Sequence, residues 1–154
     1  MKKSPLDIEI RKLQLSDIPA IFKIEKTCFP DPWSLESFRA VIPHKSYLCL
    51  GAYCDSLIGY MIAARVLDEI HIFNIAIEPE FQRSGVGGRL LKKTLETFSG
   101  LISVVYLEVR ISNRAAIAFY EKWGFRGTGM RKGYYRDGES ALLMTLYIGQ
   151  NGSC

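Results

Sequence analysis

Residues Glu80–Leu91 read EFQRSGVGGRLL and join two apolar segments of different periodicity. The apolar, partly alternating run EIHIFNIAIEP comes directly before it and is typical of a strand. From Val86 onward, apolar residues recur with a helical period of about 3.6 residues, at Val86, Leu90, Leu91, Leu95 and Phe98. The quoted stretch is therefore a strand-to-helix turn.

The turn carries three glycines, Gly85, Gly87 and Gly88, at the start of the predicted helix. Backbone N–H groups can converge there without interference from Cβ atoms, and the helix dipole adds positive potential. Such a turn binds anions, most naturally phosphate, and Arg83 and Arg89 would add charge. Two alternatives stay open: the glycines only permit a tight turn and close helix packing, and Arg89 lies on a solvated face.

The sequence lacks the patterns of other phosphate and nucleophile sites. GxxxxGK[ST] is absent, GVGGRL lacks the third glycine of the dinucleotide fingerprint, and no GxSxG elbow occurs. Nucleotide hydrolysis, hydride transfer and serine hydrolysis are therefore disfavoured.

The rest of the chain alternates strands with helices. IEIRKL predicts a first strand, and two helices follow, capped by Ser16 and Ser34 and ended near Phe29 and before Pro43. SYLCLGAY and LIGYMIAARV predict a hairpin, SVVYLEVR a strand, and RAAIAFYEKWGF a helix ended by Gly124. A second hairpin, with arms FRGTGMRK and ESALLMTLY, closes the chain. This order predicts an α/β layer structure around a mixed sheet.

The length and composition predict one globular domain. The chain has 154 residues, of which 48% are hydrophobic, so it can bury a core of its own. We expect a single domain over residues 1–148 and a flexible tail over residues 149–154. No apolar run approaches the length of a membrane span, and no apolar region follows the basic start, so we expect a cytosolic protein. A net charge of +4 suits an anionic small ligand or an acidic partner better than nucleic acid.

The potential metal ligands show no paired or clustered spacing. We therefore expect reduced thiols, no covalent enzyme intermediate and no metal. The residues concerned are Cys28, Cys49, Cys54, Cys154, His44 and His71.

QRSGVG followed by an amphipathic helix resembles the QRxGxG/A pyrophosphate loop of the Gcn5-related N-acetyltransferases (GNAT), which bind acetyl-coenzyme A (acetyl-CoA). Three longer segments resemble, in order and spacing, the RimI branch of this family, which acetylates the N-terminal amine of a small-subunit ribosomal protein. These segments are FNIAIEPEFQRSGVGGRLL, YLEVRISNRAAIAFYEKWGF and GYYRDGESALLM. CFPDPWSLESF is similar to the substrate loop of that branch, so the resemblance runs from Ile8 to Tyr147. It implies the GNAT fold, a three-layer α/β/α structure with a central mixed, mostly antiparallel twisted sheet.

The resemblance implies that acetyl-CoA is the acetyl donor and that the turn and the strand before it hold this molecule. Backbone groups of Asn74, Ile75 and Ala76 would bind the acetyl carbonyl and the pantetheine arm, as an added strand would. Asn113 would also hold the cofactor, although it is equally a good N-cap for the helix that follows. The residues of the pyrophosphate loop are Gln82, Arg83, Ser84, Gly85, Val86 and Gly87.

Two side chains are candidates for proton transfer. From its strand pattern alone, Glu108 pairs with Arg110 or faces solvent. From its helical face alone, Tyr120 is a core aromatic residue. The resemblance implies instead that Glu108 is the general base and that Tyr120 is the acid that protonates the departing thiolate.

The resemblance also implies a peptide-binding role for three aromatic residues, Trp33, Tyr134 and Tyr135. The two tyrosines lie at a hairpin turn, where the alternative is that they only pack on the base of the hairpin. Asp137 and Glu139 in the same turn would meet a basic peptide residue or remain solvated.

The predicted function is direct transfer of an acetyl group from acetyl-CoA to a protein N-terminal α-amine, with the N-terminal alanine of a small-subunit ribosomal protein as the expected substrate. Two other functions are compatible with the motifs that are expected to bind acetyl-CoA. One is acetylation of a lysine side chain or a small amine, and the other is a non-catalytic module that senses acyl-CoA. We expect a monomer whose partner is a protein N-terminus and which contacts neither nucleic acid nor membrane.

Overall fold

The computed structural model describes residues 7–149, which form two compact units. Unit 1 contains residues 7–64 and 74–99, and unit 2 contains residues 65–73 and 100–149. The expected tail over residues 149–154 lies outside the described residues except for Gly149. The expected domain boundary at residue 148 stays a prediction.

Within residues 7–149, seven strands form one mixed sheet in the order β1-β2-β3-β4-β5-β7-β6. The β1–β2, β2–β3, β5–β7 and β6–β7 pairs are antiparallel, and the β4–β5 pair is parallel. The predicted α/β class with a mixed, mostly antiparallel sheet is confirmed. The strands are β1 (Glu9–Lys12), β2 (Tyr47–Cys54), β3 (Ser56–Val66), β4 (Glu69–Ile77), β5 (Val104–Arg110), β6 (Arg126–Arg131) and β7 (Ala141–Tyr147).

Four α-helices and two short 3-10 helices lie within residues 7–149. No helix in this part of the chain is long and apolar enough to cross a membrane. The helices are α1 (Ile18–Cys28), α2 (Leu35–Val41), α3 (Val86–Thr97) and α4 (Arg114–Lys122), with the 3-10 helices η2 (Leu15–Asp17) and η3 (Pro79–Phe81).

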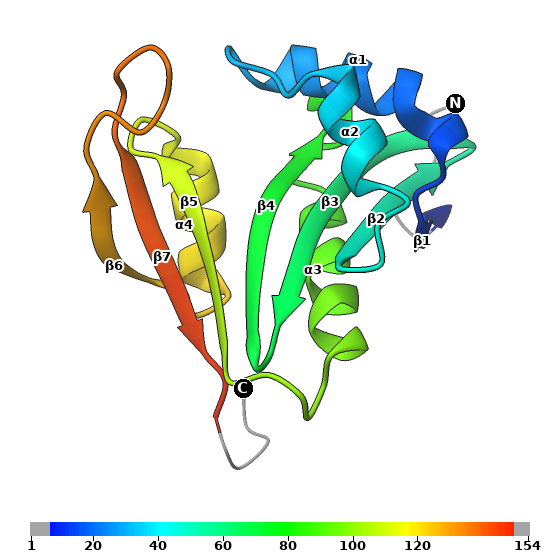
Figure 1. The fold of residues 1–154 in the computed structure, drawn as a ribbon. Coiled ribbons are helices and arrows are strands. Elements are labelled where there is room, and N and C mark those ends of the chain that lie inside the picture. Colours follow the sequence, from blue (N-terminus) through cyan, green and yellow to red (C-terminus); the bar gives the residue numbers. More distant parts are fainter. Residues whose placement is uncertain (1–6, 150–154) are drawn as a thin grey trace. The chain divides into compact units, whose positions relative to one another are not determined.

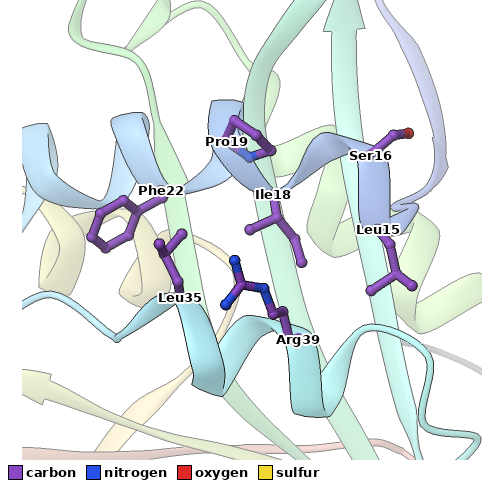
Figure 2. Close-up of a pocket in the computed structure, with 7 residues that line it drawn as sticks. All are labelled: Leu15, Ser16, Ile18, Pro19, Phe22, Leu35 and Arg39. Carbon is purple, nitrogen blue, oxygen red and sulfur yellow. The ribbon is translucent and has the colours of Figure 1, made fainter.

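Helices cover both faces of the strands of unit 1: α1 and α2 lie on one face and α3 on the other (Figure 1). The alternation of side chains along β3 explains this division, because successive residues of a strand point to opposite faces. Tyr60 and Ile62 belong to the buried cluster that α1 and α2 complete. Between them, Met61 accepts a hydrogen bond at its sulfur from the Thr94 hydroxyl of α3, at 3.1 Å.

The start of α1 differs from the prediction that Ser16 caps it. Ser16 lies inside η2, and α1 begins at Ile18 with Asp17 as its N-cap residue. The carboxylate of Asp17 reaches back to accept a hydrogen bond from the Gln14 N–H at 2.8 Å, so the polar group that organises this turn is Asp17. The cap predicted for α2 is confirmed, because the Ser34 hydroxyl accepts a hydrogen bond from the Ser37 N–H at 3.1 Å.

In unit 2, α4 lies against one face of β5 and β7 (Figure 1). Val105, Leu107 and Val109 of β5 are buried, whereas the residues between them are only partly buried. Strand alternation therefore gives β5 one apolar face and one face that carries Glu108. The predicted end of α4 is confirmed, since Gly124 follows the C-cap residue with a left-handed φ of 100°.

Candidate active site

The turn before α3 adopts two left-handed backbone conformations, at Arg83 (φ 63°) and Gly85 (φ 87°). Side chains hold the turn in place: the Gln82 amide donates to the Ile77 carbonyl at 3.0 Å, and the Ser84 hydroxyl donates to the Phe81 carbonyl. The predicted strand-to-helix turn is therefore confirmed, and side chains from the predicted loop stabilise it.

The backbone at the start of α3 has the features of an anion-binding site. The first helical N–H bond in the turn runs from Arg89 to the Gly85 carbonyl, at 3.1 Å, so the N–H groups of the residues between them have no partner within the helix. A Cβ atom at Gly85 would meet no atom within 4 Å, so the space beside the turn is open. One guanidinium N–H of Arg89 donates to the Ile8 carbonyl at 2.7 Å, which directs this side chain to the backbone next to β1.

Replacement of Gly85 by alanine should weaken acetyl-CoA binding about tenfold, because the bound phosphates require the left-handed conformation of the turn, which costs an L-residue roughly 1–2 kcal/mol. Isothermal titration calorimetry with acetyl-CoA measures the effect. Gly100→Ala is the matched control, since Gly100 has a similar φ of 80° and equally open surroundings in the loop after α3. We expect both variants to lose similar stability and only Gly85→Ala to lose cofactor affinity; equal affinities would contradict a role of the turn in binding.

A buried carboxylate, Glu25, ties the loop after α1 to the strands of unit 1. Glu25 is 1% exposed, and its Oε1 accepts hydrogen bonds from the Asn74 amide at 2.7 Å and from the Tyr60 hydroxyl. Its Oε2 accepts from the Trp33 N–H at 2.8 Å. The Asn74 side chain is thus engaged inside the protein, so the backbone groups of Asn74 are the ones left for a cofactor.

Glu108 is held by two basic side chains. Its Oε2 lies 2.6 Å from His71 Nε2, and its Oε1 lies 3.5 Å from Arg131 Nε. The imidazole of His71 also stacks on Tyr106, with ring centroids 4.6 Å apart, which fixes its orientation. The alternative that Glu108 pairs with Arg110 does not hold, because Arg110 binds two carboxylates of the second hairpin turn.

The environment of Glu108 favours the charged carboxylate. Burial by itself raises the pKa of Glu108, but the hydrogen bond and charge of His71, together with the charge of Arg131, leave the pKa below its ordinary value. A carboxylate only accepts hydrogen bonds, so Nε2 of His71 carries the hydrogen of the shared bond. At neutral pH Glu108 is therefore an oriented carboxylate that can accept a proton.

Replacement of Arg131 by glutamine should raise the pKa of Glu108, because the charge of Arg131 is one of the causes that lower it. An NMR titration of the Glu108 carboxyl carbon measures the change, with Arg126→Gln on the same strand as the control. The lowered pKa of Glu108 contributes stability that is present above the unfolded-state pKa and is lost as the pH falls through the folded-state value. Acidification should therefore destabilise the wild type more than Arg131→Gln, and an identical titration in both proteins would contradict this account.

Tyr120 is 4% exposed and belongs to the aromatic core of unit 2. Its ring centroid lies 5.3 Å from that of Phe119 and 5.5 Å from that of Phe125. Burial, and then the electrostatic interaction with Tyr135, raise the pKa of Tyr120, so its phenol stays protonated at neutral pH. Within residues 7–149, Glu108 forms a hydrogen bond with His71 and an ion pair with Arg131, but no hydrogen bond with Tyr120.

Asn113 performs the capping role that its position predicts. Its Oδ1 accepts a hydrogen bond from the Ala116 N–H at 3.2 Å, at the start of α4. The cap uses the carbonyl oxygen of the side chain, and the Nδ2 group is a separate donor. A second role in holding the cofactor therefore stays compatible with the cap.

The three predicted peptide-binding aromatics differ in how they are held. Tyr134 is 49% exposed and contacts the half-buried Tyr135 edge to face, with centroids 5.1 Å apart. Trp33 contacts Phe38 of the unit 1 core with the two rings tilted, their centroids 5.3 Å apart. The Tyr134 ring is therefore the most accessible of the three, and their roles in peptide binding stay predictions.

Residues 18–125 match the family model described as the acetyltransferase (GNAT) family. The chain is 36% identical over 143 residues to the ribosomal protein bS18-alanine N-acetyltransferase of Escherichia coli K12, an alignment that covers 90% of this chain and 97% of that protein. It is 38% identical over 142 residues to the protein of the same name from Salmonella typhimurium, covering 88% and 95%. The crystal structure of the E. coli ribosomal-protein-S18-alanine N-acetyltransferase matches with a TM-score of 0.83 at 37% identity, covering 94% of this chain and 97% of the other.

The chain therefore belongs to the acetyltransferase (GNAT) family. The predicted enzyme class, an acetyl-CoA-dependent N-terminal acetyltransferase, is confirmed, and so is the resemblance to the RimI branch.

Proposed function

We propose that this enzyme acetylates the N-terminal alanine of ribosomal protein bS18, with Glu108 as general base and Tyr120 as general acid. Two relatives that are 36% and 38% identical to the chain carry the name of this reaction. The observation that carries the chemistry is the Glu108 carboxylate, which His71 holds at 2.6 Å and whose pKa is lowered. A charged, oriented carboxylate on a half-buried face is the form that a general base requires.

A base with a lowered pKa is suited to an α-amine. The pKa of a free α-amine is about 7.7 to 8.0, so its neutral form costs only ~1.0 to 1.4 kcal/mol at pH 7. The neutral form of a lysine amine, with a pKa of about 10.4, costs about 4.6 kcal/mol. Glu108 therefore does not have to remove the first proton from a strongly basic ammonium, and its task is limited to the proton that the nitrogen loses after attack.

The proposed reaction is a direct transfer. The amine nitrogen attacks the thioester carbonyl carbon, a C–N bond forms, and the Glu108 carboxylate takes one proton from the nitrogen. The C–S bond then breaks, and the departing thiolate takes a proton from the Tyr120 phenol. Proton exchange with water returns both side chains to their initial states.

Most of the protein groups proposed to bind acetyl-CoA lie in unit 1, and one further candidate, Asn113, lies in unit 2. The turn from Gln82 to Gly87 and the free N–H groups at the start of α3 would hold the pyrophosphate. The β4–β5 ladder ends at Ile72 on β4, whereas β4 continues to Ile77. The backbone groups of Asn74 to Ala76 beyond that ladder would bind the pantetheine arm as an added strand does.

Two peptide pools test the proposed function. One pool has free α-amines and blocked lysines, the other has blocked α-amines and free lysines, and each is incubated with the purified protein and acetyl-CoA. Mass spectrometry should find acetyl groups in the first pool, enriched on peptides that begin with alanine. Acetylation of the second pool alone would favour a lysine acetyltransferase, and cofactor binding without transfer to either pool would favour a small amine substrate or a non-catalytic sensor.

A further inference from the structure

Arg110 is the last residue of β5 and lies two residues beyond Glu108. Its side chain is 11% exposed, and a single guanidinium nitrogen, Nη1, donates to Asp137 Oδ2 at 2.9 Å and to Glu139 Oε1 at 2.8 Å. Both carboxylates belong to the turn between β6 and β7, which also carries Tyr134 and Tyr135. These acids were expected either to meet a basic peptide residue or to be solvated, and within the protein both form an ion pair with Arg110.

The turn from Lys132 to Ser140 has little apolar burial to hold it, because its residues are exposed or only partly buried. Polar contacts connect it instead to the end of β5. Glu139 accepts a second hydrogen bond from the Ser112 N–H at 2.9 Å, and the Ile111 N–H donates to the Ser140 carbonyl at 3.2 Å. Arg110 supplies the positive charge in this set of contacts, and charge-assisted hydrogen bonds are stronger than neutral ones.

Arg110 also orients an aromatic ring. Its guanidinium carbon lies 4.0 Å from the centroid of the Tyr135 ring, which is the geometry of a cation–π contact. The charges of both Arg110 and Glu108 act on the pKa of Tyr135, which burial raises to about 12, so the Tyr135 hydroxyl stays protonated near the candidate base. One side chain therefore fixes both the backbone of the turn and the ring of its half-buried tyrosine.

We propose that Arg110 is a positioning residue that holds the β6–β7 turn, and with it Tyr135, in the conformation that receives the peptide α-amine next to Glu108. This inference rests on the proposed function, because it assigns the turn to the peptide and not to acetyl-CoA. Arg110 touches no reacting atom; it acts through Asp137, Glu139 and Tyr135.

The variants Arg110→Met and Arg110→Lys separate the two kinds of contact. Methionine keeps apolar volume and removes the charge. Lysine can still place one nitrogen between Asp137 and Glu139, since Nη1 alone makes both bonds, but it lacks the flat group that stacks on Tyr135. Arg126→Met, at the opposite end of β6 from the turn, is the matched control.

We expect Arg110→Met to raise the KM for a peptide with a free α-amine about tenfold, the size of a lost charge-assisted contact. Arg110→Lys should raise it about threefold, since only the cation–π contact is lost. The affinity for acetyl-CoA should stay within about twofold of wild type in both variants, because the turn that Arg110 holds is proposed to bind the peptide and not acetyl-CoA. Equal losses of peptide and cofactor binding, or a wild-type KM in Arg110→Met, would overturn the proposal.

Hydrogen–deuterium exchange on the free enzyme gives a readout that does not depend on catalysis. Amides of residues 132–140 should exchange faster in Arg110→Met than in wild type, while those of α3 should not change. Unchanged exchange in the turn would overturn the proposal whatever the activity. A wild-type enzyme that acetylates no α-amine would instead refute the proposed function, and the exchange experiment would still decide whether Arg110 holds the turn. Should Arg110→Met fail to fold, Glu139→Gln tests the same contact from the other side, with the same expected rise in KM and in exchange.

Discussion

The Glu108→Gln variant should bind acetyl-CoA as the wild type does and lose about 10²- to 10⁴-fold in kcat, the range for removal of a general base. Glutamine has the same shape, and its carbonyl oxygen can still accept the hydrogen bond from His71 Nε2, so the local packing should persist. It cannot take a proton from the nitrogen after attack. Steady-state kinetics with an N-terminal peptide, together with calorimetry for acetyl-CoA, separates the two effects.

Glu121→Gln is the control for this experiment, because Glu121 is an exposed glutamate of α4. Its kcat should equal that of the wild type. A wild-type rate in Glu108→Gln would remove Glu108 from the mechanism and leave the His71 contact as a structural ion pair.

The Tyr120→Phe variant should lose about 10²-fold in kcat, at the lower end of the range for general acid catalysis. The reason is that burial raises the pKa of Tyr120, which keeps the phenol protonated but makes it a weaker acid. The ring contacts with Phe119 and Phe125 remain in phenylalanine, so the melting temperature should change little. Kinetics and thermal unfolding on the same samples check both expectations.

Tyr147→Phe provides the matched control, since Tyr147 is 73% exposed on β7 and loses the same hydroxyl group. A second test uses a donor thioester with a leaving thiol of lower pKa, which needs less protonation. The difference between Tyr120→Phe and wild type should shrink with that donor. A full rate in Tyr120→Phe with acetyl-CoA would return Tyr120 to a purely structural role in the core.

The order and type of the elements could be predicted from the sequence because most of the signals are local. Helical periodicity after Val86, a cap at Ser34 and a glycine at position 124 each depend on a few neighbouring residues, and the structure confirms them. The Ser16 cap failed for a local reason as well: two adjacent positions offered a polar side chain, and the carboxylate of Asp17 takes the Gln14 N–H.

The partners within the candidate site could not be predicted in the same way. His71 meets Glu108 because β4 and β5 pair in parallel, with His71 opposite Tyr106. A register between strands separated by a helix is not encoded in the spacing of either strand. The sequence does show His71 at an alternating position of an apolar strand, but this position does not indicate which residue His71 contacts. The Arg110 contacts depend likewise on how the turn between β6 and β7 folds back toward the end of β5.

The most direct test uses a peptide with the N-terminal sequence of ribosomal protein bS18, beginning with alanine, and an otherwise identical peptide whose α-amine is already acetylated. Both are incubated with the wild-type protein and acetyl-CoA, and tandem mass spectrometry locates any new acetyl group. We predict one acetyl group on the alanine nitrogen of the first peptide, formed by the wild type and Glu121→Gln but hardly at all by Glu108→Gln, and no change in the blocked peptide. Acetylation of a lysine in both peptides, with the free α-amine left unmodified, would refute the proposed function.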